Sequence, residues 1–194
     1  MKLRRLRNRA FSLVELMIVV AIIGVLSTLA INGVRKYLAN AKTAEARNAL
    51  GAIAKAAVIS YDTEKMAGAA TAVNVAGGGA VVTGSKSFCL SAAAPVPAAV
   101  PLAQKWTPST LGTADFQAGD AVTGWKCLKF SMDSPIAYQY RYLATAAVSA
   151  GTFTATATGD LNGDGVTSLF TLGGAATNGV AKVQATIQEA NPDE

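Results

Sequence analysis

The amino-acid sequence predicts an α+β fold, in which a long N-terminal helix packs on an antiparallel β-sheet. The first third of the chain joins an apolar run to a segment rich in Ala, Lys, Glu and Arg, which are good helix formers. The last third contains short segments that alternate between apolar and polar residues, as half-buried strands do. Neither element can bury its apolar side alone, so we expect the helix to cover one face of the sheet.

The N-terminal helix is expected in two parts. The apolar run Phe11–Ile31 is close to the ~20 residues that an α-helix needs to cross a bilayer core. Residues 32–66 continue the helix amphipathically, because apolar residues recur there at three- and four-residue spacing. These residues form one stripe: Leu50, Ile53, Ala54, Ala57, Val58 and Tyr61.

Residues 1–10 form a basic leader. The whole chain has 17 Lys and Arg against 12 Asp and Glu, and five of the cations precede Phe11, so the remainder is neutral (17 − 5 = 12). This charge distribution predicts no specific nucleic-acid ligand, which would need cations clustered on a folded face. Basic residues beside an apolar run instead favour retention on the cytoplasmic side of a membrane. The five cations are Lys2, Arg4, Arg5, Arg7 and Arg9.

Residues 67–194 are expected to form a globular head. Gly, Ala, Ser and Pro dominate residues 67–123, which predicts irregular connections with one or two short strands. Strand patterns follow, and the short gaps between them indicate an antiparallel meander. The expected strands are Gly124–Phe130, Ala137–Thr145, Gly151–Gly159 and Val166–Leu172.

The side-chain inventory excludes several kinds of catalytic site. The chain has no His, which rules out His-based metal sites and nucleophile–His pairs. No catalytic constellation is evident, so we predict that the protein is not an enzyme. Cys89 and Cys127 are the only cysteines, and in an exported domain they indicate one disulfide. Two buried free thiols are the alternative.

One segment resembles the start of a calcium-binding loop. Asp160, Asn162 and Asp164 occupy alternate positions and are followed by Gly165, as the oxygen ligands of such loops do. The twelfth position is Thr171 rather than a bidentate Glu. Because Asn-Gly and Asp-Gly are also good turn formers, a simple turn between strands is favoured over a calcium site. No other cofactor is predicted.

The first sixty or so residues resemble the type IV pilin family, which includes the pseudopilins of type II secretion. The resemblance is carried by the leader "KLRRLRNR", the string "FSLVELMIVVAIIGVLSTLAI" and the Ala-rich helix behind it. It implies a class III signal that a prepilin peptidase cuts between Ala10 and Phe11, with N-methylation of Phe11. Two positions depart from the family pattern: Ala10 replaces the usual Gly, and Asn32 stands where many pilins have Pro.

The resemblance also implies a role for Glu15, the one carboxylate in the apolar run. A charge at the bilayer centre costs about 2.5–3.5 kcal/mol on insertion scales and therefore usually has a partner or a function. In pilins this carboxylate is thought to meet the N-terminal amine of a neighbouring subunit and to set the register of assembly. The alternative is a Glu15 that lies near the interface and is solvated by headgroups.

The implied function is that of a structural subunit of a type IV pilus, a filament for adhesion and twitching motility. Its partners would be copies of itself, the prepilin peptidase, the inner-membrane assembly machinery and, for the monomer, the membrane. The chain would lie in the inner membrane first and in the extracellular filament afterwards. A minor pilin or a type II pseudopilin is the close alternative. An anchored single-span binding domain that never polymerises is the alternative from another class.

Overall fold

The computed structural model describes residues 11–63, 73–75, 79–81, 86–145 and 151–192. The chain divides into two units, residues 1–38 and 39–194. One long helix, α1 (Leu13–Asp62), contributes its first half to the first unit and its second half to the second. The expected end of this helix near Met66 lies outside the described residues.

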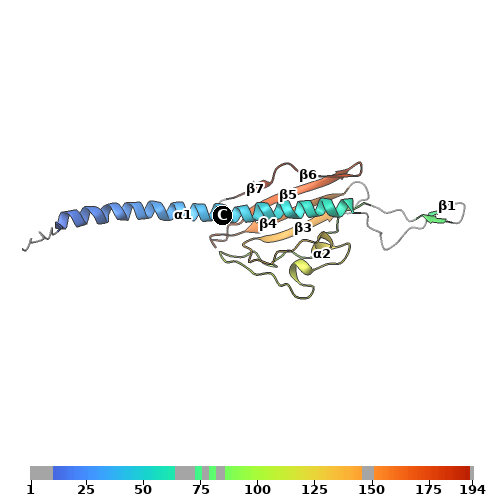
Figure 1. Ribbon diagram of the computed structural model, residues 1–194, viewed down its shortest axis with the longest axis horizontal. Coiled ribbons are helices and arrows are strands. Elements are labelled where there is room, and N and C mark those ends of the chain that lie inside the picture. The colour runs from blue at the N-terminus through green and yellow to red at the C-terminus, as the bar shows by residue number, and fades with distance from the viewer. Residues whose placement is uncertain (1–10, 64–72, 76–78, 82–85, 146–150, 193–194) are drawn as a thin grey trace, which may run out of the picture. The chain divides into compact units, whose positions relative to one another are not determined.

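The second unit combines the second half of α1 with a five-stranded antiparallel sheet (Figure 1). The strand order is β3-β4-β5-β6, and β7 also pairs with β5. The antiparallel meander predicted from the sequence is thus confirmed, and so is the α+β class. The strands are β3 (Gln139–Thr145), β4 (Thr152–Gly159), β5 (Ser168–Thr177), β6 (Val180–Val183) and β7 (Gln188–Ala190).

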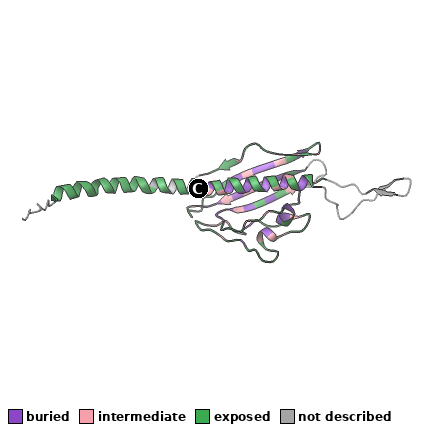
Figure 2. Ribbon diagram, viewed as in Figure 1, coloured by how far each residue is buried: buried purple, intermediate pink, exposed green. Residues whose placement is uncertain are grey.

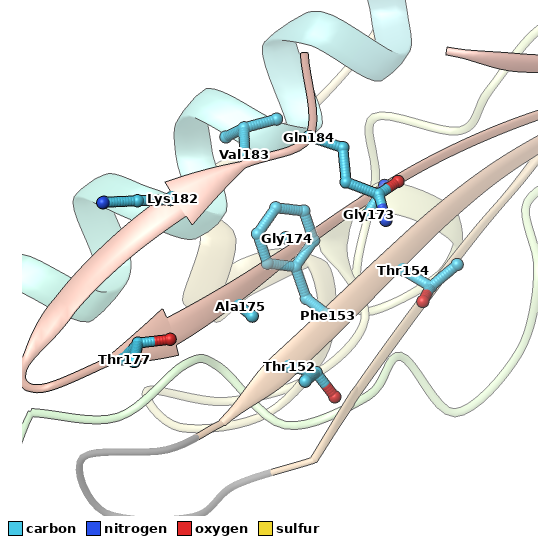
Figure 3. Close-up of a pocket in the computed structure, with 10 residues that line it drawn as sticks. All are labelled: Thr152, Phe153, Thr154, Gly173, Gly174, Ala175, Thr177, Lys182, Val183 and Gln184. Atoms are coloured by element: carbon cyan, nitrogen blue, oxygen red, sulfur yellow. The ribbon is translucent and has the colours of Figure 1, made fainter. Parts of the chain in front are cut away.

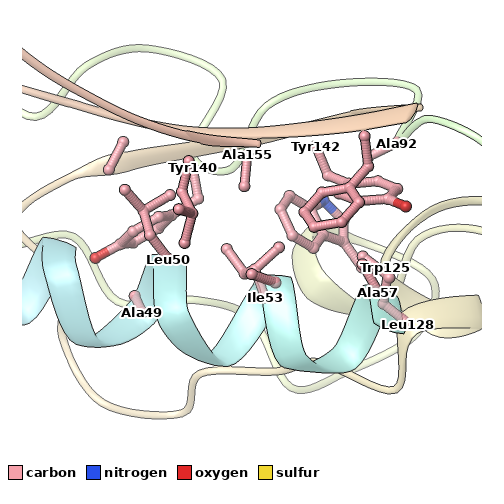
Figure 4. Close-up of a cluster of buried hydrophobic side chains, with 14 of the residues drawn as sticks. Ala49, Leu50, Ile53, Ala57, Ala92, Trp125, Leu128, Tyr140, Tyr142 and Ala155 are labelled. Atoms are coloured by element: carbon pink, nitrogen blue, oxygen red, sulfur yellow. The ribbon is translucent and has the colours of Figure 1, made fainter. Parts of the chain in front are cut away.

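The core lies between α1 and the sheet. Figure 4 shows Leu50 and Ile53 of the helix pointing at Tyr140, Tyr142 and Ala155 of the strands, and all five are fully buried. The helical stripe predicted from the sequence is confirmed for most of its members, since Val58 is half-buried and the others are buried. Figure 2 shows the resulting alternation of buried and exposed residues along the second half of α1.

Alternation along the strands separates the two faces of the sheet. In β4 every second residue from Phe153 is buried under α1, while the threonines between them lie on the opposite face. Tyr138 precedes β3 and joins the same core, where burial raises the pKa of its phenol to about 12. The opposite face of β4 consists of Thr152, Thr154, Thr156 and Thr158.

Two glycines let aromatic rings lie directly on the sheet backbone. A Cβ at Gly159 would lie 2.6 Å from two ring carbons of Tyr138, and a Cβ at Gly174 would lie 2.4 Å from the ring of Phe153. Since neither ring could tolerate this contact, both positions require the absence of a side chain.

One segment before the sheet differs from the sequence prediction. The expected strand Gly124–Phe130 is wrong: residues Gly124–Leu128 form the short helix α2. Trp125 and Leu128 are both buried at i, i+3 spacing, and Lys129 ends the helix in the left-handed conformation, with φ of 54°. The remaining short elements are β1 (Val73–Val75), β2 (Gly79–Val81) and the 3₁₀ helix η1 (Asp115–Gln117).

Candidate functional site

The candidate site is the start of α1, where Ser12 caps the helix. The Ser12 hydroxyl accepts the backbone N–H of Glu15 at 3.2 Å, and the Ser12 carbonyl accepts the N–H of Leu16 at 3.3 Å. Ser12 and Glu15 therefore have the Ser-x-x-Glu spacing of a capping box, which satisfies otherwise unpaired N–H groups at a helix start. The signal is present in the sequence as Ser-x-x-Glu directly before the apolar run, although it is not among the predicted site features.

Glu15 lies in the first turn of α1 and is exposed. The positive end of the helix dipole favours a carboxylate at this position. Among the described residues, no cation pairs with it. Within residues 11–63 and the described part of the head, nothing therefore neutralises this carboxylate.

The helix that follows Glu15 is apolar and uncovered. Residues Leu13–Ile31 have a mean hydropathy of 2.6, and by length and composition this segment can cross a membrane. None of this segment is buried within the chain. Thr28 adds little polarity, because its hydroxyl donates to the carbonyl oxygens of Gly24 and Val25 at 3.1 and 2.7 Å.

The expected cleavage point is only half described. Phe11 is 75% exposed and precedes the first residue of α1, whereas Ala10 lies outside the described residues. A cut before Phe11 leaves the Ser12 cap and Glu15 intact on the helix.

The predicted disulfide is confirmed. Cys89 and Cys127 are bonded, with their Cα atoms 5.8 Å apart, so the alternative of two free thiols is wrong. The bond joins residues that are 38 apart in the sequence. It ties the irregular segment around Cys89 to the short helix α2. Its Cys89 end is held further by the hydroxyl of Tyr142, which donates to the Cys89 carbonyl at 3.1 Å.

The predicted calcium ligands lie in the loop between β4 and β5, where their oxygens bond to the backbone. The buried carboxylate of Asp160 accepts N–H groups from Gly163 and Gly165 at 2.6 and 2.9 Å. The amide oxygen of Asn162 accepts the N–H of Asp164 at 2.9 Å. These bonds are those of a well-capped turn, which is the interpretation that the sequence favours over a calcium site.

Two charged residues of α1 bind the head and were not singled out as site residues by the sequence. Arg47 donates to both carboxylate oxygens of Glu189, at 2.7 and 2.8 Å. Glu45 accepts the backbone N–H of Ala137 at 2.9 Å and lies 3.5 Å from the ammonium of Lys105. The partners of Glu45 and Arg47 are far away in the sequence. The sequence around these two residues therefore could not predict which residues they bind.

Known proteins share the N-terminal segment. Residues 5–31 match the family described as the prokaryotic N-terminal methylation motif. The chain is also similar to the type IV major pilin protein PilA of Myxococcus xanthus (strain DK1622), with 53% identity over 47 residues. This match covers 24% of the chain and 21% of the length of that relative. No solved structure matches the chain significantly. The methylation motif and the pilin similarity each cover a quarter of the chain or less, so they show a likeness to type IV pilins for the N-terminal segment alone.

Proposed function

We propose that the chain is a structural subunit, not an enzyme, which polymerises through α1 into a type IV pilus. The observation that carries the proposal is the apolar segment Leu13–Ile31, of which none is buried within the chain. An uncovered apolar helix needs either lipid or other apolar helices around it. A subunit that is stored in the inner membrane and then bundled with copies of itself meets this need in both states.

Processing at the Ala10–Phe11 junction is part of the proposal. The methylation motif at residues 5–31 supports it, because the junction and the first turns of α1 both fall within the match. A prepilin peptidase would cut before Phe11, and methylation of the new amine would leave a cation there. Glu15 would then bind this cation on a neighbouring subunit, so that a slipped helix would leave both charges unpaired.

The proposed partners are copies of the same chain, the peptidase and the inner-membrane assembly machinery. The mature subunit would lie in an extracellular filament that serves adhesion and twitching motility. The Myxococcus relative is a major pilin, but the similarity is confined to an N-terminal segment. Electron microscopy of a deletion strain separates the roles, because loss of a major pilin removes the filaments and loss of a minor pilin or pseudopilin does not.

The decisive test is the mature N-terminus. Mass spectrometry of protein from the native host is expected to find a chain that begins with N-methylated Phe11. A mature chain that still begins at Met1 would overturn the proposal and favour an anchored binding domain that does not polymerise. A mature chain that begins at Phe11 would also show that the peptidase accepts Ala10 in place of the usual Gly.

A further inference from the structure

A trough lies on the face of the sheet opposite α1. It has a volume of about 380 Å³ and follows β5 (Figure 3). Its floor is Gly173 and Ala175, two of the four Gly and Ala residues of the strand. One wall is formed by threonines of β4, and the other by β6 and the residue after it. These wall residues are Thr152, Thr154, Lys182 and Gln184.

Strand register creates the hollow. Thr152, Ala175 and Lys182 are direct neighbours across three strands, so a small residue lies between two larger ones. Thr154 is the neighbour of Gly173, whose carbonyl accepts the backbone N–H of Gln184 at 2.8 Å. The side-chain oxygen of Gln184 also accepts the N–H of Gly173 at 3.3 Å, which holds the amide at the edge of the trough.

Packing constrains residue 173 less tightly than residue 174. Gly174 must lack a side chain, because the ring of Phe153 lies against it. A Cβ at Gly173 would lie 3.3 Å from the side-chain oxygen of Gln184 and 3.3 Å from the backbone carbonyl oxygen of Phe153, so it would fit only after a small shift. Glycine inside a strand costs stability and often marks a place where a ligand or another chain segment approaches closely. At Gly173, which is buried, the Gln184 amide makes this approach, so a ligand would meet Gln184 and the neighbouring Ala175.

The trough has a cation at its rim and no carboxylate. Lys182 is exposed and makes no ion pair within the part of the chain that the structure describes. The only carboxylate on the five strands is Glu189, which binds Arg47. Phe153 and Val183 add apolar atoms to the lining, beside which the trough offers threonine hydroxyls, a side-chain amide and an uncompensated ammonium.

We propose that the trough binds a carboxylate-bearing saccharide, as a short stretch of an acidic sugar chain. Hydroxyl and amide groups that both donate and accept match sugar hydroxyls, and Lys182 matches the carboxylate. The volume lies near the lower end of the range for small-ligand sites. A phosphate would favour Arg clusters or converging backbone N–H groups, which this trough lacks among its described residues.

The inference deepens the proposed function by naming a ligand class for adhesion. Binding by a single chain does not depend on that function, whereas strong attachment through many repeated sites rests on it. A filament would repeat the trough along its length, so weak single sites would add up to strong attachment. Each single chain already contains the whole trough, which makes binding measurable without assembly.

The test uses the full-length chain in detergent micelles and calorimetric titration with polygalacturonate, with neutral dextran as the comparison polymer. We expect binding to polygalacturonate only. Lys182→Gln should weaken it roughly ten- to hundredfold, as the loss of a hydrogen bond to a charged group does. Ala175→Trp should abolish it by filling the floor. Arg141→Gln is the matched control, because it removes an exposed cation of β3 outside the trough and should bind as wild type does.

Three outcomes would overturn the proposal: no binding by wild type, equal binding of dextran, or equal loss in the Lys182 and Arg141 variants. Equal loss in both variants would mean that the polymer is attracted by the net positive charge of the surface and not by the trough. Unchanged melting of Lys182→Gln shows that its loss of binding is not a loss of folding. The variant Glu15→Ala, which is expected not to assemble, should still bind polygalacturonate as a monomer. Failure of the filament proposal would therefore change assembly, whereas failure of the trough proposal would change binding.

Discussion

Arg47 and Glu189 join the helix to the C-terminal strand of the sheet, although they lie 142 residues apart in the sequence. The guanidinium donates from Nε and Nη2 to the two carboxylate oxygens, at 2.7 and 2.8 Å. Its Cζ also lies 5.8 Å from the ring centroid of Phe170 on β5. The paired geometry fixes β7 against α1 more specifically than a single-point ion pair would.

We predict that Glu189→Gln lowers the free energy of unfolding by about 0.5–1 kcal/mol at pH 7, the range for a partly exposed ion pair with good geometry. The hydrogen bond from Arg47 holds the pKa of Glu189 below its ordinary value of 4.5. The folded state thus binds this proton less readily than the unfolded chain does. The contribution is therefore complete above pH 4.5 and is lost as the pH falls through the folded pKa.

Denaturant titration of wild type and variant in detergent, at neutral and acidic pH, measures both effects. The difference between the two proteins should shrink as Glu189 becomes protonated. Asp62→Asn, which changes an exposed carboxylate at the end of α1, is the control and should have little effect. Equal stability of wild type and Glu189→Gln at pH 7 would contradict the prediction.

Local patterns predicted the parts of the fold in which neighbouring residues decide the structure. The helical stripe around Leu50 and the alternation in β4 are periodic, and both were found where expected. The segment Gly124–Phe130 also alternates, but its tertiary contacts override the pattern. The ring centroids of Trp125 and Phe116 lie 5.2 Å apart in an edge-to-face arrangement, and Cys127 is bonded to Cys89. A helical turn allows Trp125 and Cys127 to make both contacts.

The rest of the fold depends on residues far apart in the sequence. β6 is four residues long and largely exposed, so it lacks the alternation that identifies a half-buried strand. β7 is shorter still, and all three of its residues are classed as exposed, so it shows no alternation either. In the candidate site, Glu15 was identified because a charge in an apolar run is conspicuous, whereas the partners of Arg47 and Glu45 emerge only from the folded chain.

A pair of glycine substitutions tests the packing of Tyr138. Gly159→Ala should lower stability by about 1–3 kcal/mol, because the added methyl would overlap the buried ring. Gly51→Ala should raise stability by about 0.5–1 kcal/mol, because this exposed helical position has no atom within 4 Å of the new Cβ. Thermal melting followed by circular dichroism measures both, and shifts of the same sign would refute this account.

Removal of the disulfide should cost about 3–4 kcal/mol. The bond closes a separation of 38 residues, and the chain-entropy model assigns the benefit to a less disordered unfolded state. The double variant Cys89→Ala/Cys127→Ala, unfolded in denaturant beside wild type, measures the loss. Reduced wild type is the control and should resemble the variant. A double variant as stable as the oxidised wild type would contradict the prediction.

Calcium should not change the melting temperature, because the oxygens of Asp160 already accept two backbone N–H groups. Asp160→Asn should lower stability by about 1.5–3 kcal/mol with or without a chelator, as expected for hydrogen bonds to a buried charge. Scanning calorimetry with calcium and with chelator tests both statements. Stabilisation by calcium that disappears in Asp164→Asn would instead establish a metal site.

Glu15 has two possible roles, and one pair of variants separates them. Glu15→Gln keeps a side chain that suits the third position of a capping box, while Glu15→Ala removes it. If the carboxylate pairs with the N-terminal amine of a neighbouring subunit, both variants lose the charge and neither should form filaments. If Glu15 only caps α1, Glu15→Gln should assemble normally.

We expect both variants to insert into the membrane and both to lose filaments, as counted by electron microscopy of sheared fractions. Thr28→Val is the control for a polar residue in the same helix: its hydroxyl bonds to the carbonyls of Gly24 and Val25, so its loss should leave assembly intact. An unpaired charge at the centre of an apolar layer costs about 2.5–3.5 kcal/mol. In Glu15→Gln the methylated amine of Phe11 would carry this penalty in every subunit, so the charge rather than the shape of the side chain would decide whether helices align.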